Sequence, residues 1–172
     1  APVDVFEGTG PTPGTSLRPK LGATQEGKFR AAYADMAYEN GAYAGAAANY
    51  ATMTVTAAYD IENVKFDAYD VVVNKPRTQD YRAPSSPAAA FAVEQLVDEL
   101  AEKLKMDPLA LRLKNAAHEG TKGPMGMPYR AIGHEEGLEA AMSSPHYLPP
   151  LEGPDRGRGG ALLKDGKKGA LL

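Results

Sequence analysis

The stretch from Asn74 to Asn115 most constrains what this chain can fold into. An extended run ends at Pro76, because proline has no N–H to donate to a β-ladder, and a polar loop then carries Arg82. A long helix is predicted to follow that loop. Its apolar side chains recur at helical spacing, at Ala89, Val93, Leu96, Leu100 and Leu104. The pattern therefore predicts a strand, a loop and a helix in succession, with a basic side chain just before the helix N-terminus.

The start of this helix and of a second one are also marked in the sequence. Ser86 is a favourable N-cap, and Pro87 falls at the first helical position, where its missing N–H costs nothing. Glu94 and Asp98 are expected on the water-facing side of the helix. Asp107-Pro108 predicts the beginning of a second helix, which is expected to reach about residue 117.

The residues before this stretch predict strands and one short helix. Strands at Leu17–Thr24 and Phe29–Tyr38 flank a turn in which Gly27 can take a positive φ. Residues 42–58 favour a helix over a strand, because apolar side chains recur at helical spacing, at Ala46, Tyr50, Met53 and Ala57. Several β-branched residues in the same segment weaken this helix prediction. Small side chains there allow either tight helix packing or the close approach of a flat ligand. From residue 64 a strand is expected, with Val71–Val73 buried on both faces.

Together these elements predict an α+β fold, in which a β-hairpin and further strands pack against the helix of residues 86–105. Residues 17–148 are expected to form the folded part, including a short helix at His134–Met142. Residues 1–16 are expected to be irregular. Residues 149–172 are rich in glycine, proline and lysine, which predicts an irregular, flexible tail.

Composition excludes several classes of function. The chain has 172 residues and a net charge of -3, and no basic run could follow a phosphate backbone, so no nucleic-acid partner is expected. No apolar run approaches the roughly 20 residues that span a bilayer, and no signal peptide is visible, so a cytoplasmic location is expected. Cysteine is absent, which excludes thiolate and iron–sulfur ligation within the chain. Three scattered histidines form no zinc motif.

Arg82 is the candidate site residue that the local pattern suggests. It precedes a helix N-terminus, where backbone N–H groups point outward and favour anions. The small residues Ala83, Pro84 and Ser85 would let a ligand approach the main chain. An ordinary surface arginine explains the same pattern equally well. Ser85 is not a candidate nucleophile, because it lacks the G-x-S-x-G context.

A family resemblance is carried by the run VVVNKPRTQDYRAPSSPAAAFAVEQLVDELAEKLKMDPLALRLKNAAHEG. It resembles the molybdenum-binding large subunit of the xanthine dehydrogenase family, which includes aldehyde oxidases and aerobic carbon monoxide dehydrogenases. In that family an NKPxT-type turn leads into a [YF]-R-[GA]-x-G-x-P-Q loop, a helix and a G-[ML]-D-P-x-E-x-R-x-K-N segment. The preceding residues and the later SSPHYLPPLEGPDRGRG also resemble the family. The chain is therefore identified as a middle fragment of such a subunit.

The resemblance implies a molybdenum hydroxylase that places water-derived oxygen on an electrophilic carbon. It implies a molybdopterin cofactor, in bacteria often the cytosine dinucleotide, with iron–sulfur centres and FAD on partner domains or subunits. Tyr81, Arg82 and Ala83 match the family's cofactor-binding loop, in which the arginine makes its contact through the backbone amide. Pro84 and Tyr50 match positions that face the substrate.

Several departures from the family pattern narrow the range of substrates that the resemblance implies. Carbon monoxide dehydrogenases have a copper-bearing cysteine where this chain has Ala83, and purine-oxidising members have an arginine near the position of Tyr50. The implied substrate is therefore an aldehyde or an N-heteroaromatic or purine-like ring. Ser85 and Ser86 stand where the family usually has Gly-Ala or Gly-Gly.

The family's glutamate base lies downstream of the matched region, so no catalytic residue and no metal ligand are expected in this chain. The rest of the molybdenum subunit, iron–sulfur and flavin subunits, and a small-molecule substrate are the expected partners. The alternative is a catalytically silent assembly module that binds a partner subunit without any cofactor.

Overall fold

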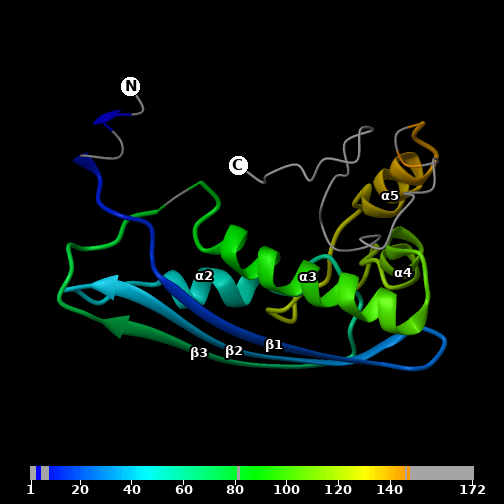
Figure 1. Ribbon diagram of the computed structural model, residues 1–172, viewed down its shortest axis with the longest axis horizontal. Helices are drawn as coiled ribbons and strands as arrows, with labels where there is room; N and C mark the ends of the chain where they lie inside the picture. Colours follow the sequence, from blue (N-terminus) through cyan, green and yellow to red (C-terminus); the bar gives the residue numbers. More distant parts are fainter. Residues whose placement is uncertain (1–2, 5–7, 81, 146, 148–172) are drawn as a thin grey trace, which may run out of the picture.

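The computed structural model describes residues 3–4, 8–80, 82–145 and 147. Strands β1 (Thr15–Ala23), β2 (Phe29–Gly41) and β3 (Asn63–Val72) form one sheet in the order β1-β2-β3. Helices α2 (Ala47–Thr54) and α3 (Ser86–Leu104) lie along the same face of the sheet (Figure 1). Helices α4 (Pro108–Lys114) and α5 (His134–Met142) follow at the far end of α3. The α+β fold predicted from the sequence is confirmed.

The β1–β2 hairpin forms where the sequence predicts it. Thr15 pairs with Tyr38 and the antiparallel ladder continues to Ala23 and Phe29. Gly27 closes the turn with a φ of 82°, a region that favours glycine, and its N–H donates to the Thr24 carbonyl at 3.0 Å. A Cβ at Gly27 would also lie 2.6 Å from the Met106 Sδ, so the turn packs directly against the connection between α3 and α4.

The prediction that Val71–Val73 are buried on both faces is wrong. Val71 and Val72 are 39 % and 60 % exposed. β3 pairs with β2 in parallel and lies at the edge of the sheet, and of the described helices α2 is the one that packs against it. The strand is therefore half-buried only in its middle, at Phe66–Ala68, and exposed towards both ends.

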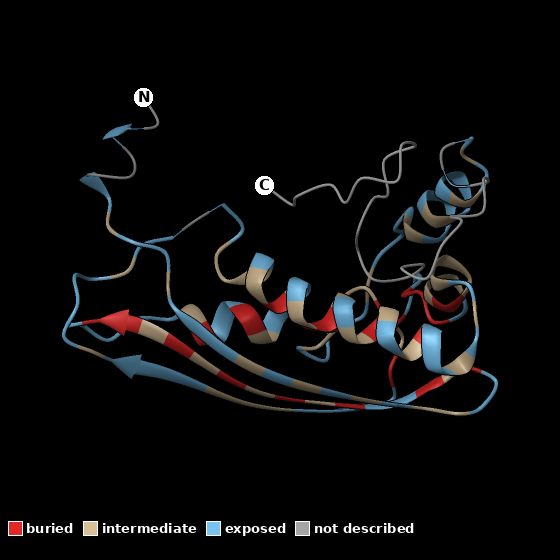
Figure 2. Ribbon diagram, viewed as in Figure 1, coloured by how far each residue is buried: buried red, intermediate tan, exposed pale blue. Residues whose placement is uncertain are grey.

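The core lies between the sheet and the two helices that cover it (Figure 2). Alternate residues of β2 point into it, and α3 contributes Ala89, Val93, Val97 and Ala101. Two of these were predicted from the sequence, while Leu100 and Leu104 are only partly buried against the same core. The predicted helix at residues 42–58 is confirmed as α2, but its buried residues are Ala48 and Ala51, and Tyr50 and Met53 are exposed.

Two polar clusters hold α4 in place: a buried one joins it to the β1–β2 hairpin, and a partly exposed one joins it to α3. Asn115 is fully buried and accepts a hydrogen bond from the Phe29 N–H at 2.7 Å, while its Nδ2 donates to the Gly27 and Leu111 carbonyls. Arg112 binds Glu94 at 2.8 Å and Asp98 at 2.7 Å. Glu94 and Asp98 therefore do not simply face water as predicted, because α4 brings a guanidinium against α3.

The N-cap of α3 also differs from the prediction. Ser85 rather than Ser86 occupies the cap position, with a φ of 60°, and its side chain makes no capping hydrogen bond. Ser86 is instead the first helical residue, and its hydroxyl donates to the Pro84 carbonyl. By contrast, the Asp107 carboxylate caps α4 as expected and accepts from the Leu109 and Ala110 N–H groups at 2.9 Å.

Candidate functional site

The segment between β3 and α3 is fixed by backbone contacts to the end of β2. The Val73 N–H donates to the Gly41 carbonyl at 3.0 Å, and the Thr78 N–H donates to the Asn40 carbonyl at 3.1 Å. The end of β2 and the segment after β3 cross so closely that a Cβ on Gly41 would overlap the Pro76 carbonyl. Gly41 has a φ of 75°, so glycine is favoured at this crossing for both reasons. The segment that carries the candidate residues is thereby held at one end of the sheet.

Two residues of the loop before α3 have left-handed backbone conformations. The φ angles are 55° at Ala83 and 60° at Ser85, a region that disfavours residues with a Cβ. The loop is nevertheless well held, because the Ser86 N–H donates to the Pro84 carbonyl at 2.8 Å and the Tyr38 hydroxyl donates to the Ser85 carbonyl at 3.3 Å. At position 83 the resembled family has glycine or alanine, and at position 85 it has glycine. The structure thus gives a backbone reason for the family pattern.

Relieving the strain at Ser85 should stabilise the fold. We expect Ser85→Gly to raise the free energy of unfolding by about 0.5–1 kcal/mol, since the strain of a left-handed residue exceeds the added entropy of glycine in the unfolded chain. Ser85→Val should lower it by about 2 kcal/mol, because a β-branched residue tolerates positive φ poorly. Urea unfolding measures both. Ser143→Gly is the control, because Ser143 has an ordinary φ of -83° and the same change there should destabilise slightly.

Arg82 and Ala83 are exposed, and their backbone N–H groups have no acceptor among the residues that the structure describes. Both donors precede a 19-residue helix whose first turn has no side-chain cap. Such donors at a helix N-terminus can bind an acceptor-rich ligand through the main chain. Tyr81, the third residue predicted to bind the cofactor, lies outside the described residues.

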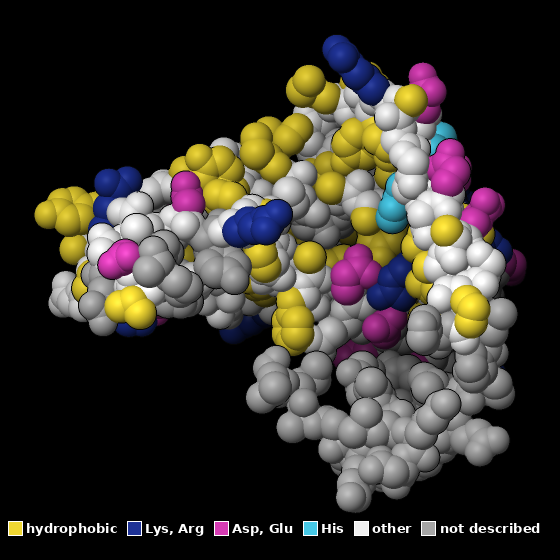
Figure 3. Space-filling view, turned by 90° about the horizontal axis from the view of Figure 1, so that it is seen from above, with side chains coloured by type: hydrophobic (Ala, Val, Ile, Leu, Met, Phe, Trp, Pro, Cys, Tyr) yellow, Lys and Arg dark blue, Asp and Glu magenta, His cyan; other side chains and the backbone are white. Residues whose placement is uncertain are grey.

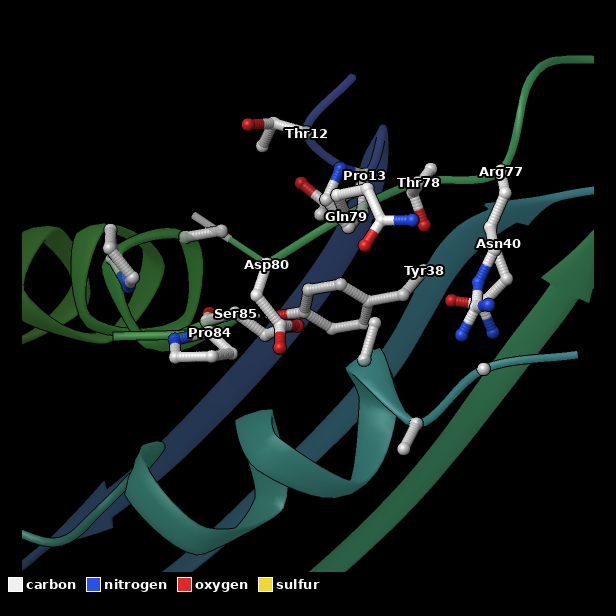
Figure 4. A pocket seen from close by; sticks show the side chains of 16 residues that line it. Thr12, Pro13, Tyr38, Asn40, Arg77, Thr78, Gln79, Asp80, Pro84 and Ser85 are labelled. Atoms are coloured by element: carbon white, nitrogen blue, oxygen red, sulfur yellow. Dashed lines mark hydrogen bonds between the residues drawn. The ribbon is translucent and has the colours of Figure 1, made fainter. Parts of the chain in front are cut away.

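A cavity lies beside this loop, and we refer to it as the Asn40 cavity. Its walls are residues 12–15, the end of β2, the start of α2, residues 77–80 and the start of α3 (Figure 4). Its volume is about 130 Å³. Of the residues predicted to face the substrate, Pro84 lines this cavity, whereas Tyr50 does not and is 39 % exposed on α2. Arg82 and Ala83 are not among its lining residues.

Asn40 is the functional candidate that sequence reasoning missed. Its side chain is 2 % exposed and lines the cavity, yet its Nδ2 has no hydrogen-bond partner in the described part of the chain. Leaving a buried amide donor unpaired costs about 1–3 kcal/mol, so an acceptor within the cavity would be favourable. The strand predicted from the sequence ends at Tyr38, two residues before Asn40, so the pattern gave no sign of a buried side chain at this position.

Tyr38 closes the wall of the cavity next to the loop. Burial raises the pKa of Tyr38 to about 12. Because the pKa is higher in the folded state, the stability linked to protonated Tyr38 should be fully present below about pH 10, the ordinary tyrosine value, and be lost as the pH rises towards 12. Urea unfolding between these pH values should show a steeper loss of stability for the wild type than for Tyr38→Phe. Equal slopes would contradict a buried, protonated Tyr38.

The remaining described surface offers few other candidates. No group of three or more histidine, aspartate or glutamate side chains is arranged to hold a metal ion within the described residues. None of the described helices is both long and apolar enough to cross a membrane. On the face shown in Figure 3, lysine and arginine side chains are scattered among apolar and acidic ones. The loop before α3 and the Asn40 cavity therefore form the candidate site.

Comparison with known proteins agrees with this fold. A family model described as "Molybdopterin cofactor-binding domain" matches residues 4–116, which is more than half of the chain. The chain therefore belongs to the molybdopterin cofactor-binding domain family. The resemblance to molybdenum-binding subunits of the xanthine dehydrogenase family is thus confirmed.

Individual relatives and solved structures are also similar to this chain in sequence and in fold. The chain is 34 % identical over 126 residues to the nicotinate dehydrogenase large molybdopterin subunit of Eubacterium barkeri, covering 71 % of this chain and 30 % of that protein. It is 42 % identical over 72 residues to the aldehyde oxidoreductase of Megalodesulfovibrio gigas, covering 42 % and 8 % respectively. The structure of aldehyde oxidoreductase from Desulfovibrio gigas matches with a TM-score of 0.73 and 28 % identity, over 76 % of this chain and 15 % of that one. The chain thus spans less than a third of these relatives.

Proposed function

We propose that this chain forms one wall of the molybdopterin site in a larger molybdenum hydroxylase. The observation that carries the proposal is the pair of exposed N–H donors at Arg82 and Ala83, which have no acceptor among the described residues. A molybdopterin presents many oxygen and nitrogen acceptors, so the donors fit it. The cofactor would supply the redox chemistry of hydroxylation, and the residues of this chain would bind and orient it through the main chain.

The Asn40 cavity is too small for the cofactor, so the cofactor and the substrate would bind in different places. Its volume of about 130 Å³ is close to the ~150 Å³ of a cavity that holds one benzene ring, whereas a metal-bearing pterin is much larger. The cofactor would therefore lie against the exposed side of the loop, and the cavity would be left for a small molecule. Pro84 would adjoin both the cofactor and the small molecule, because it follows the two N–H donors in the loop and lines the cavity.

The proposed substrate class is an aldehyde or an N-heteroaromatic or purine-like ring, hydroxylated with water-derived oxygen. Relatives named for nicotinate and for aldehydes support this class. Ala83 in place of a copper-bearing cysteine argues against carbon monoxide chemistry. Electrons would leave through iron–sulfur and FAD partners, in a cytoplasmic complex that carries the cytosine dinucleotide form of the cofactor.

Cofactor content tests the proposal against the alternative of a silent assembly module. We expect about one molybdenum and one pterin per polypeptide in the purified subunit that carries this segment. Acid hydrolysis should also release cytidine monophosphate if the dinucleotide form is present. A correctly folded subunit that assembles with its partners but contains neither molybdenum nor pterin would support the assembly module instead.

A further inference from the structure

We propose that the Asn40 cavity is a binding site for a small planar ring that carries a carboxylate. This inference concerns residues that the cofactor contact does not use, and it is tested without molybdenum. Three features of the cavity carry it: its volume, its unpaired donors and the placement of its charges.

The volume limits the ligand to about one ring. At about 130 Å³ the cavity is slightly smaller than the ~150 Å³ that accommodates benzene in a protein interior. Its walls include the Tyr38 ring and the small residues Gly45, Ala46, Ala47 and Ala88, which leave flat apolar surface between the polar groups. A six-membered ring fits this space, and a substituent on it would reach the rim where Arg77 is exposed.

The donors at one end of the cavity require an acceptor. Asn40 Nδ2 is buried without a partner among the described residues, and none of their acidic groups pairs with the Arg77 guanidinium. Arg77 lines the same cavity but is itself exposed at its rim. A carboxylate satisfies both groups, because guanidinium and amide N–H donors bind its oxygens in one plane.

The acidic group that faces the cavity sets the orientation of the ligand. Asp80 lies beside Pro84 and Ser85, while Arg77 lies beside Asn40 towards the other side (Figure 4). Like charges repel, so the carboxylate of the ligand would lie next to Arg77 and Asn40 and its ring would extend towards Pro84. The ring would then reach the part of the cavity that adjoins the loop of the proposed cofactor contact.

The position of Asn40 itself depends on Gly45. A Cβ at Gly45 would lie 2.8 Å from both the amide carbon and the Oδ1 of Asn40. Gly45→Ala should therefore push the amide out of place without removing it. This gives a variant that alters the site while leaving every polar group of the cavity in the chain.

Binding of benzoate to the full 172-residue chain, followed by nuclear magnetic resonance, tests the proposal directly. We expect saturable shifts of the Asn40 side-chain amide signals. Benzamide has the same shape without the charge, and it should bind at least about tenfold more weakly, since a charged acceptor strengthens each hydrogen bond. Inorganic phosphate should not displace benzoate.

Variants make the assignment specific to these residues. Arg77→Gln and Gly45→Ala should each weaken benzoate binding about tenfold or more. Arg130→Gln should leave it unchanged, because Arg130 is also exposed but does not line the cavity. Absence of saturable binding, equal affinity for benzamide, displacement by phosphate, or an unchanged affinity in Arg77→Gln would each overturn the proposal. None of these outcomes bears on the molybdenum content of the complete subunit, so the two proposals can fail independently.

Discussion

Replacing Asn115 by alanine should lower the free energy of unfolding of this chain by about 3–5 kcal/mol. The side chain is fully buried and satisfies three backbone groups, namely the Phe29 N–H and the Gly27 and Leu111 carbonyls, over 2.7–2.9 Å. Alanine would leave all three without a partner, and each unpaired buried group costs about 1–3 kcal/mol. The hairpin turn would also lose its direct connection to α4.

Urea unfolding followed by circular dichroism measures this loss. Asn63→Ala is the matched control, because the Asn63 side chain is exposed and makes one hydrogen bond of 3.2 Å to the Arg30 carbonyl. That control should change the free energy of unfolding by less than about 0.5 kcal/mol. A loss below about 1 kcal/mol in Asn115→Ala would show that water or a rearranged backbone replaces these hydrogen bonds.

The second large effect should come from Arg112. Its side chain is 14 % exposed and binds Glu94 and Asp98, and the Tyr59 hydroxyl donates to the same Glu94 carboxylate at 2.8 Å. Arg112→Met should lower the free energy of unfolding by about 2 kcal/mol. We expect less than for a fully buried ion pair, because the carboxylates are 39 % and 34 % exposed and water screens them once the guanidinium is lost.

A matched pair of variants separates charge from geometry at this position. Arg112→Lys keeps the positive charge but cannot bind both carboxylates with a planar fork, so it should recover less than half of the loss. Chemical unfolding of the single variants and of their combination with Asp98→Asn gives the coupling energy. If Arg112→Lys were as stable as the wild type, the two carboxylates would not need the guanidinium geometry that the structure shows.

The hairpin, the helices and their order could be predicted from the sequence because each has a local cause. The turn at Gly27, the proline at position 87 and the Asp107 cap act within a few residues. The pairing of β2 with β3 is parallel and joins residues far apart in the chain. No local pattern indicates which strand becomes an edge, and this is why Val71 and Val72 were expected to be buried.

The site was only partly accessible to sequence reasoning for the same reason. The family pattern located the loop of Arg82 and Ala83, and Pro84 does line a cavity. It did not indicate Asn40, whose burial depends on the crossing of Gly41 with Pro76 and on the space left by Gly45. It also grouped Tyr50 with Pro84, whereas α2 leaves Tyr50 exposed and outside the Asn40 cavity. The roles proposed for Arg82, Ala83, Pro84 and Tyr50 remain predictions.

The most direct measurement of the central claim is the molybdenum content of the complete subunit in two Arg82 variants. If the contact is made by the backbone, Arg82→Ala should retain nearly the wild-type content, because its N–H remains. Arg82→Pro should reduce it at least about fivefold, because proline has no N–H to donate. Thermal unfolding should first confirm that both variants are folded. Equal molybdenum content in the folded alanine and proline variants would contradict the account.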